Sequence, residues 1–336
     1  MTAFNGDGIM SAMKISMIGE ACKHKEELIK QCAAELEIRE LPAEAAYSAE
    51  YDPQIAGSDV VITLKYRRPA GEGPDFRVLQ VPGAGLDGIE TNSLPAGALL
   101  CNVYEHQIPI AEYVMTAMLE CELRFSEMRR RFDPRRWASL YYSRVPHGEL
   151  YTKTLALIGF GGIAREIAKR ARAFGMRITA VDKYAKDPDG LADLLTDNGG
   201  MDRVLKEADY LVLACPLTAE TEGMINAERL AVMKDSAVLI NVSRGPLIVE
   251  ADLYEALREN RLGGAVLDVW WRYPRNRNDE ISPAEFPFES LDNVVCTPHS
   301  SAWTRELMWR RYGVIAKNIE NLSAGRPLRN IIDYKG

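Results

Sequence analysis

The sequence lacks the features that mark secreted, metal-dependent and membrane-spanning proteins. Its six cysteines form no Cys-x-x-Cys pair and have apolar neighbours, which favours reduced, mostly buried thiols in a cytoplasmic protein. The four histidines show no spacing with carboxylates that indicates a metal site. No apolar run reaches the length of a membrane span, and residues 1–13 lack the apolar stretch of a signal peptide. We therefore expect a cytoplasmic protein without a bound metal, in which residues 1–12 form a loose leader.

The sequence also lacks an excess of positive charge. Lys and Arg number 41 against 48 Asp and Glu, which gives a formal net charge of −7, and the basic residues are spread along the chain. This balance gives no reason to expect nucleic-acid or membrane binding. With 336 residues, of which 47% are hydrophobic, the chain is long enough for two domains with sizeable cores.

Residues 154–182 carry the strongest local pattern. An apolar run at 155–158 predicts a buried strand, and a helical pattern begins near Ile163 and ends before Gly175. Between them lies the turn Gly-Phe-Gly-Gly-Ile-Ala at 159–164. A second strand at 177–181 ends at Asp182, 23 residues after Gly159. This strand–turn–helix–strand context is the one in which a glycine-rich turn binds a dinucleotide.

Each position of the turn has a mechanical reason. Gly159 allows the tight turn out of the strand, Gly161 lets a pyrophosphate approach the backbone, and Ala164 is small enough for close packing of helix on strand. Free N–H groups at the helix N-terminus then face the phosphates. Asp182 can accept hydrogen bonds from the adenine-ribose hydroxyls and would repel a 2′-phosphate, so the sequence predicts NAD rather than NADP.

Strand patterns alternate with helical patterns along the rest of the chain. This alternation predicts an α/β protein with doubly wound parallel sheets. The other expected strands span residues 14–18, 37–41, 59–64, 76–81, 98–102, 209–214, 237–241, 264–267 and 293–296. The other expected helices span 25–35, 108–130 and 302–323.

We place the domain crossover in the long helical pattern at 108–130. The predicted domains are residues 1–107 with 302–336, and residues 108–301 between them. A polar, aromatic stretch follows at 131–152, and five arginines lie between Arg129 and Arg136. We interpret this stretch as a solvated arm that packs on a second copy of the chain, with an anion site as the alternative.

Polar residues follow the carboxyl ends of several predicted strands, where open α/β sheets bind their ligands. Arg244 offers a planar fork that suits a carboxylate, and His299 can exchange a proton near neutral pH. Reduction of a 2-keto acid by a nicotinamide needs these two groups: a cation for the carboxylate and an acid for the carbonyl oxygen. In the alternative, structural interpretation, Arg244 forms a salt bridge at a helix start, and His299 is a histidine whose hydrogen bonds are satisfied at a strand end.

The chain resembles the D-isomer-specific 2-hydroxyacid dehydrogenases over almost its full length. The motifs that carry the resemblance lie at residues 83–87, 111–112, 159–164, 216–218, 241–245, 267–269 and 297–299. The resemblance implies a flavodoxin-like substrate domain built from both chain ends, a Rossmann NAD-binding domain inserted in it, and a homodimer formed through the NAD-binding domain.

The resemblance also implies roles for individual residues. Arg244 would hold the substrate carboxylate, His299 would be the acid and base, and the main-chain amides of Ala84 and Gly85 would contact the same carboxylate. Lys65 and Arg67, after the third strand, are either contacts for a second anionic group or surface charges. The predicted cofactor contacts are Gly159, Gly161, Gly162, Ile163, Asp182, Cys215, Pro216, Thr221, Val242, Ser243, Arg244 and Asp268, with Asp268 near the nicotinamide amide.

The sequence departs from the family pattern at Tyr273. The family carries a glutamate there, which pairs with the histidine and raises its pKa, whereas a neutral phenol can orient the ring but cannot stabilise imidazolium. Three interpretations stay open: His299 works with a lower pKa, a carboxylate of the next loop (Asp279, Glu280 or Glu285) replaces the missing one, or the reaction needs no acid–base pair, as in formate-oxidising members of the family.

We therefore predict an NAD-dependent oxidoreductase that interconverts a small D-2-hydroxy acid and its 2-keto acid, with Arg244, His299 and Tyr273 as the catalytic set. Glyoxylate and hydroxypyruvate are reasonable substrates. The alternatives are an NAD-sensing binding protein, similar to corepressors of the same fold, and a formate-type dehydrogenase.

Overall fold

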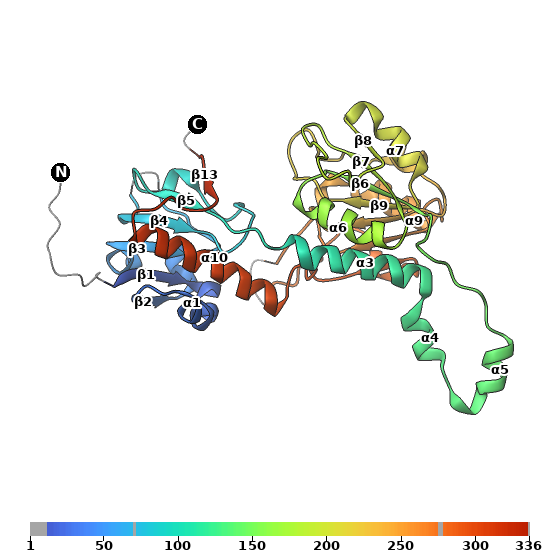
Figure 1. Cartoon of the computed structure of the whole chain (residues 1–336), viewed down its shortest axis with the longest axis horizontal. Helices are drawn as coiled ribbons and strands as arrows, with labels where there is room; N and C mark the ends of the chain where they lie inside the picture. The colour runs from blue at the N-terminus through green and yellow to red at the C-terminus, as the bar shows by residue number, and fades with distance from the viewer. Residues whose placement is uncertain (1–11, 70–71, 275–277, 335–336) are drawn as a thin grey trace. The chain divides into compact units, whose positions relative to one another are not determined.

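The computed structural model describes residues 12–69, 72–274 and 278–334, so all but the last residue of the expected leader lies outside the described residues. The chain divides into two compact units (Figure 1). The first comprises Met1–His106 and Thr304–Gly336, and the second comprises Gln107–Trp303. Within the described ranges, no helix is both long and apolar enough to cross a membrane.

The first unit contains a sheet with the strand order β13-β5-β4-β3-β1-β2. Its strands are parallel apart from β13, which pairs antiparallel with β5 at one edge. The order 2-1-3-4-5 of the parallel strands is that of flavodoxin-like sheets, so the predicted architecture is confirmed. The strands are β1 Met13–Ile18, β2 Leu36–Leu41, β3 Ser58–Ile62, β4 Phe76–Gln80, β5 Leu99–Cys101 and β13 Ile331–Ile332.

Helices α1 Lys25–Gln31, α2 Asp52–Ile55 and α10 Arg305–Ser323 belong to the same unit. The closing helix α10 packs Tyr312, Ile315 and Ile319 into the apolar core over the sheet. It begins at Arg305 rather than at Ala302, because the Thr304 hydroxyl caps it by accepting the N–H of Leu307 at 3.1 Å. The expected start at residue 302 was therefore wrong by three positions.

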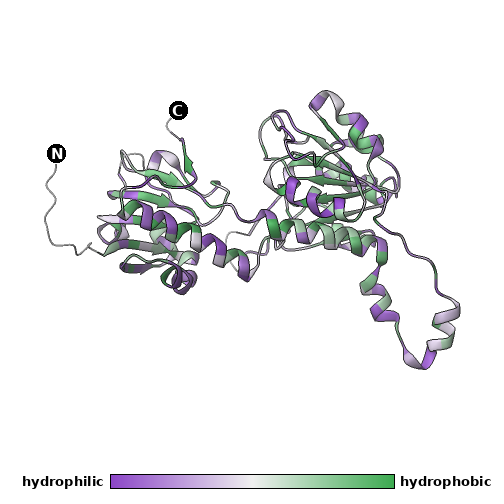
Figure 2. Ribbon diagram, viewed as in Figure 1, coloured by the Kyte–Doolittle hydropathy of each residue, from purple (hydrophilic) through white to green (hydrophobic). Residues whose placement is uncertain are grey.

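The second unit contains a seven-stranded sheet with the order β12-β11-β10-β9-β6-β7-β8, in which every pairing is parallel. The order reverses between β6 and β9, which is the point where doubly wound sheets bind dinucleotides. Figure 2 shows the apolar strands enclosed between helices. The strands are β6 Thr154–Ile158, β7 Arg177–Val181, β8 Leu194–Thr196, β9 Tyr210–Leu213, β10 Val238–Asn241, β11 Gly264–Leu267 and β12 Val294–Cys296.

The helices of this unit cover the sheet from both faces. Helix α3 (Gln107–Leu123) packs with α6 (Gly162–Ala173) in one apolar core, and α7 (Met201–Glu207), α8 (Ala227–Ala231) and α9 (Glu250–Arg258) contribute to another. Strand β8 and these last three helices were not predicted individually. Two faces covered by helices explain why the strands read as continuous apolar runs rather than as alternating patterns.

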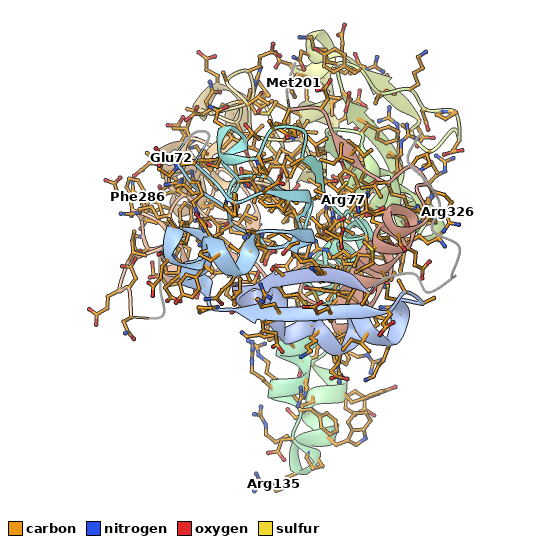
Figure 3. The ribbon with its side chains drawn as sticks, turned by 90° about the vertical axis from the view of Figure 1, so that its left-hand side faces the viewer. Glu72, Arg77, Arg135, Met201, Phe286 and Arg326 are labelled. Carbon is orange, nitrogen blue, oxygen red and sulfur yellow. The ribbon has the colours of Figure 1, made fainter. Side chains whose placement is uncertain are left out.

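The predicted helix at 108–130 is interrupted, so that expectation was wrong. Helix α3 ends at Leu123, Arg124 adopts a left-handed conformation with φ 52°, and α4 (Phe125–Arg131) follows. The Glu120 carboxylate accepts the N–H of Ser126 at 3.1 Å, which supplies a cap for the new helix. Helix α5 (Trp137–Tyr142) completes an arm in which Arg135 lies at the far end (Figure 3).

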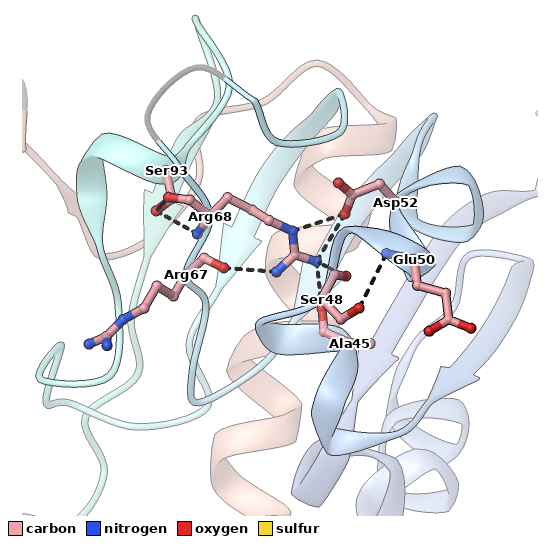
Figure 4. Close-up of polar contacts among 7 residues, drawn as sticks. All are labelled: Ala45, Ser48, Glu50, Asp52, Arg67, Arg68 and Ser93. Atoms are coloured by element: carbon pink, nitrogen blue, oxygen red, sulfur yellow. Dashed lines mark hydrogen bonds and ion pairs between the residues drawn. The ribbon is translucent and has the colours of Figure 1, made fainter.

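One buried arginine fastens the segment that follows β3. The guanidinium of Arg68, whose side chain is 1% exposed, donates to Asp52 Oδ1 from Nε at 3.0 Å and from Nη2 at 2.9 Å (Figure 4). It also donates to the carbonyls of Ala45, Ser48 and Arg67 at 2.7–2.9 Å. A buried guanidinium is stable only when its donors are paired in this way. The segment carrying Lys65 is therefore held in a defined conformation.

Candidate functional site

The glycine-rich turn lies where the strand order reverses. Gly159 has φ +88°, and a Cβ there would lie 2.8 Å from the main-chain nitrogen of Cys215, which follows the neighbouring strand β9. Only glycine fits this conformation and this approach of two backbones. Gly161 and Gly162 are exposed, and a Cβ on either would meet nothing within 4 Å. Helix α6 begins at Gly162, so its free N–H groups lie beside an open space.

Asp182 follows β7 and is held by the backbone around this turn. Its Oδ2 accepts the N–H of Phe160, and its Oδ1 accepts the N–H groups of Tyr184 and Ala185, each at 2.8 Å. Burial raises the pKa of the carboxyl, but these N–H groups and the Arg165 guanidinium outweigh it, so the pKa lies below its usual value. A carboxylate has about four acceptor positions, so one on Oδ2 is left for a ribose hydroxyl.

Three further predicted cofactor residues lie in the turns after β9 and β10: Cys215, Thr221 and Ser243. Thr221 Oγ1 donates to the carbonyl of Pro216 at 2.7 Å and accepts the N–H of Thr218 at 2.8 Å. Cys215 is buried, and burial raises the pKa of its thiol to about 11, so this sulfur is an unreactive thiol at neutral pH. The Ser243 hydroxyl donates to the carbonyl of Cys215, which ties the ends of β9 and β10 together.

Arg244 follows β10 in a turn that Asn241 holds. The Asn241 amide donates to the carbonyl of Arg244 at 2.9 Å and accepts the N–H of Ser243 at 3.1 Å. The next residue, Gly245, passes under the backbone of the loop after β11: a Cβ there would lie 2.4 Å from the carbonyl carbon of Trp270. This close approach places the Arg244 turn against the loop that carries Tyr273.

Asp268, at the end of β11, fastens the loop that carries His299. The carboxylate is fully buried, and its Oδ1 accepts the Thr297 hydroxyl at 2.6 Å and the Ser300 N–H at 2.8 Å. Its Oδ2 accepts the N–H of Ser301 at 3.0 Å. His299 lies between these contacts with φ 55°, a left-handed conformation that a non-glycine residue adopts only when its surroundings enforce it.

Two side chains that were not predicted as site residues complete this loop. The Tyr113 hydroxyl of α3 lies 2.6 Å from Thr297 Oγ1. The indole N–H of Trp270 donates to the carbonyl of Thr297 at 2.9 Å. The sequence offered no signal for Tyr113, because its partner is 184 positions away. Trp270 contributes through its indole nitrogen, a contact that no sequence pattern indicates.

Tyr273 lies beside the imidazole of His299, with 2.9 Å between the phenol oxygen and Nδ1. The same oxygen accepts the main-chain N–H of Trp270 at 3.1 Å. Among the described residues, Tyr273 is the hydrogen-bond partner of the imidazole, and the imidazole makes no such bond to Asp279, Glu280 or Glu285.

Partial burial lowers the pKa of His299, and the Arg244 guanidinium lowers it further, while Asp268 opposes both. Burial also raises the pKa of Tyr273. The imidazole and the phenol are therefore both neutral at pH 7. Arg244, Asp268, Tyr273 and His299 thus form one electrostatically coupled group at the carboxyl ends of the adjacent strands β10, β11 and β12.

The remaining predicted substrate residues lie in the first unit. The carbonyl of Ala84 accepts the Asn102 amide at 3.0 Å, which orders the turn that also contains Gly85. Lys65 is exposed, and a Cβ on Gly88 would lie 3.0 Å from its Cγ, so Lys65 adjoins the same turn. Arg67 pairs with Glu90 at 2.7 Å, which leaves Lys65 as the better candidate for a second anionic group.

Comparison with known proteins identifies the family of the chain. The family profile described as D-isomer specific 2-hydroxyacid dehydrogenase, NAD binding domain, matches residues 115–301. Glycerate dehydrogenase of Methylorubrum extorquens is 32% identical over 265 residues, which cover 77% of this chain and 80% of the relative. Hydroxypyruvate reductase of Thermotoga maritima is 36% identical over 244 residues, which cover 72% and 76%.

Other relatives are longer, and solved structures share the fold. The chain spans only 48% of D-3-phosphoglycerate dehydrogenase of Methanocaldococcus jannaschii, to which it is 32% identical over 262 residues, or 77% of this chain. The crystal structure of a D-isomer specific 2-hydroxyacid dehydrogenase family protein from Aeromonas salmonicida matches with a TM-score of 0.78 and 26% identity, covering 97% of this chain and all of the other. The chain therefore belongs to the D-isomer specific 2-hydroxyacid dehydrogenases, a family of NAD(P)-dependent oxidoreductases.

Proposed function

We propose that the protein reduces a small 2-keto acid to the corresponding D-2-hydroxy acid with NADH. The observation that carries this proposal is the coupled group formed by Arg244, Asp268, Tyr273 and His299 at one edge of the nucleotide sheet. A guanidinium that binds a carboxylate, next to an imidazole that gives up a proton, is the pair that this reduction needs. Bound NADH would supply the hydride.

The chain's own residues would hold the cofactor at the reversal of strand order. The exposed backbone of Gly161 and Gly162 at the start of α6 suits a pyrophosphate, and the free acceptor position of Asp182 suits a ribose hydroxyl. The lowered pKa of Asp182 keeps it negatively charged, which disfavours a 2′-phosphate. The other cofactor contacts in this proposal are Gly159, Ile163, Cys215, Pro216, Thr221, Val242, Ser243, Arg244 and Asp268.

Arg244 would clamp the substrate carboxylate and polarise the adjacent carbonyl, and His299 would protonate the carbonyl oxygen. The first unit would add the main-chain amides of Ala84 and Gly85, with Lys65 as a contact for a further polar or anionic group. Relatives named glycerate dehydrogenase, hydroxypyruvate reductase and glyoxylate reductase favour glyoxylate and hydroxypyruvate as substrates.

A second copy of the chain is the proposed partner. The arm formed by α4 and α5 exposes large apolar side chains, including Phe132 at 59%, Trp137 at 57% and Tyr142 at 86%. Exposed aromatic side chains of this density mark a protein–protein interface. We place the homodimer in the cytoplasm, since its six cysteines are free thiols.

The proposed activity is tested by following NADH oxidation with a panel of 2-keto acids. With the preferred acid, His299→Gln should lower kcat by about 100-fold or more, the usual contribution of a general acid. Arg244→Gln should raise KM sharply. His147→Gln, which alters an exposed histidine of the arm, should leave both parameters unchanged. NADH binding without turnover of any 2-keto acid would overturn the proposal and favour an NAD-sensing protein.

A further inference from the structure

The phenol oxygen of Tyr273 has two hydrogen-bond partners within the protein, the main-chain N–H of Trp270 and Nδ1 of His299. Its oxygen already accepts the main-chain N–H of Trp270. If Nδ1 of His299 carried the hydrogen, the phenol oxygen would accept two N–H groups, and its own hydrogen would go to solvent, since Tyr273 is exposed. The arrangement that satisfies all three groups within the protein has the phenol O–H donating to Nδ1. The single hydrogen of the neutral imidazole then lies on Nε2.

We propose that Tyr273, oriented by the Trp270 amide, keeps His299 in the tautomer with its hydrogen on Nε2 and resupplies Nδ1 with a proton while Nε2 protonates the substrate. This inference rests on the proposed reductase function and assigns to Tyr273 a task that differs from that of the family's glutamate. A carboxylate accepts the hydrogen of Nδ1 and stabilises imidazolium, whereas the phenol donates to Nδ1 and keeps the ring neutral.

The proton transfers balance without a further reactant. Bound NADH would supply the hydride that the keto carbon accepts, and the electron pair of the C=O π bond would move onto the carbonyl oxygen. That oxygen takes the proton from Nε2 of His299, and Nδ1 takes the proton from the Tyr273 hydroxyl. The products are the hydroxy acid, a neutral imidazole with its hydrogen on Nδ1, and a tyrosinate. Return of a proton from solvent to Nε2, with transfer of the Nδ1 hydrogen back to the phenolate, restores the starting state.

The charges around Tyr273 and His299 act on the relay in both directions. Arg244 disfavours imidazolium and favours the tyrosinate, whereas Asp268 has the opposite effect on each group and burial raises the pKa of the phenol. The main-chain N–H of Trp270, which already donates to the phenol oxygen, is the contact that stabilises the tyrosinate. Without resupply at Nδ1, a neutral imidazole that loses its Nε2 proton would become an imidazolate, which is far more basic than a phenolate. The phenol therefore removes the main obstacle to proton donation by a neutral His299.

The tautomer is tested first, because this measurement does not depend on turnover. Two-bond ¹H–¹⁵N NMR spectra distinguish the two neutral tautomers, and comparison with His299→Gln assigns the signals among the four histidines. We expect the Nε2–H form in the wild-type protein near pH 7.5 and loss of its dominance in Tyr273→Phe. Tyr47→Phe, which removes an exposed phenol hydroxyl of the first unit, should leave the spectrum unchanged. A dominant Nδ1–H form in the wild type would overturn the proposal, whether or not Tyr273→Phe folds.

Kinetics then test the relay. In Tyr273→Phe, kcat for reduction near pH 7.5 should fall about 100-fold with little change in KM, and the loss should shrink near pH 5, where imidazolium can donate. Oxidation of the hydroxy acid by the wild type should rise at alkaline pH as the phenol ionises, and this rise should be absent in Tyr273→Phe. A change of less than about twofold in kcat would overturn the relay. If NMR shows the Nε2–H tautomer but the protein turns over no 2-keto acid, the proposed function is refuted, and so is the relay that depends on it.

Discussion

The exchange Asp268→Asn separates two roles of this carboxylate. The resemblance to the family implies a contact with the nicotinamide amide, whereas the structure shows three hydrogen bonds to the loop of His299. If these bonds are its main task, the exchange should destabilise the protein in the absence of NAD. If the cofactor contact is its main task, only cofactor affinity should change.

The size of the effect follows from the contacts. Hydrogen bonds to a charged acceptor contribute about 1.5–3 kcal/mol each, and a buried donor left without a partner costs about 1–3 kcal/mol. Asparagine can keep the two bonds to Oδ1 in weakened form, but its NH2 group then faces the buried N–H of Ser301. We expect a loss of about 3 kcal/mol in the free energy of unfolding. The loop should then hold the left-handed His299 less firmly, so kcat should fall as well.

Urea unfolding of the cofactor-free protein measures this loss. Asp252→Asn is the matched control, because Asp252 accepts one N–H, from Ala227 at 2.8 Å, in an exposed position, and its loss should cost less than about 1 kcal/mol. Unchanged stability of Asp268→Asn together with a raised KM for NADH would show that the loop contacts are dispensable. That result would refute the positioning role assigned to Asp268.

Three further outcomes are expected. Gly159→Ala should destabilise the protein by at least about 2 kcal/mol, because alanine is strained at φ +88° and its Cβ would lie 2.8 Å from the Cys215 nitrogen. Gly161→Ala, where a Cβ meets nothing within 4 Å, should preserve folding. Thermal unfolding compares the two variants. Arg68→Met should lower the free energy of unfolding by about 3 kcal/mol, because it leaves Asp52 unpaired. Arg67→Met, at an exposed position, should lower it by less than about 1 kcal/mol. Urea unfolding measures both losses. Because the pKa of His299 is lower in the folded protein than in the unfolded chain, the unfolded chain binds a proton at this imidazole first as the pH falls. The free energy of unfolding of the wild type should therefore decrease as the pH drops through about 6.5. His299→Gln should lack this decrease.

The sequence by itself determined the features that depend on near neighbours. The turn at 159–164, the helix behind it and the strand ending at Asp182 each follow from local φ requirements and from hydrophobic period, and the structure reproduces them. The parallel sheets likewise follow from alternating strands and helices. Two of the boundaries that failed, at Arg124 and Thr304, depend on side-chain caps that periodicity does not register. A third, the end of the helix expected at 25–35, lies at Gln31 instead.

Only the tertiary structure decided how the candidate catalytic group is held. Tyr273 and His299 are 26 positions apart, and Asp268 and Ser301 are 33 apart, so no local pattern reveals that a phenol meets Nδ1 or that a buried carboxylate fastens the histidine loop. The sequence marked Tyr273 as a departure and left three interpretations open. The main-chain N–H of Trp270, which no sequence pattern could orient, fixes the direction of the phenol's hydrogen bond. Strand order brings these groups to one edge, and the loops after the strands decide which atoms meet there.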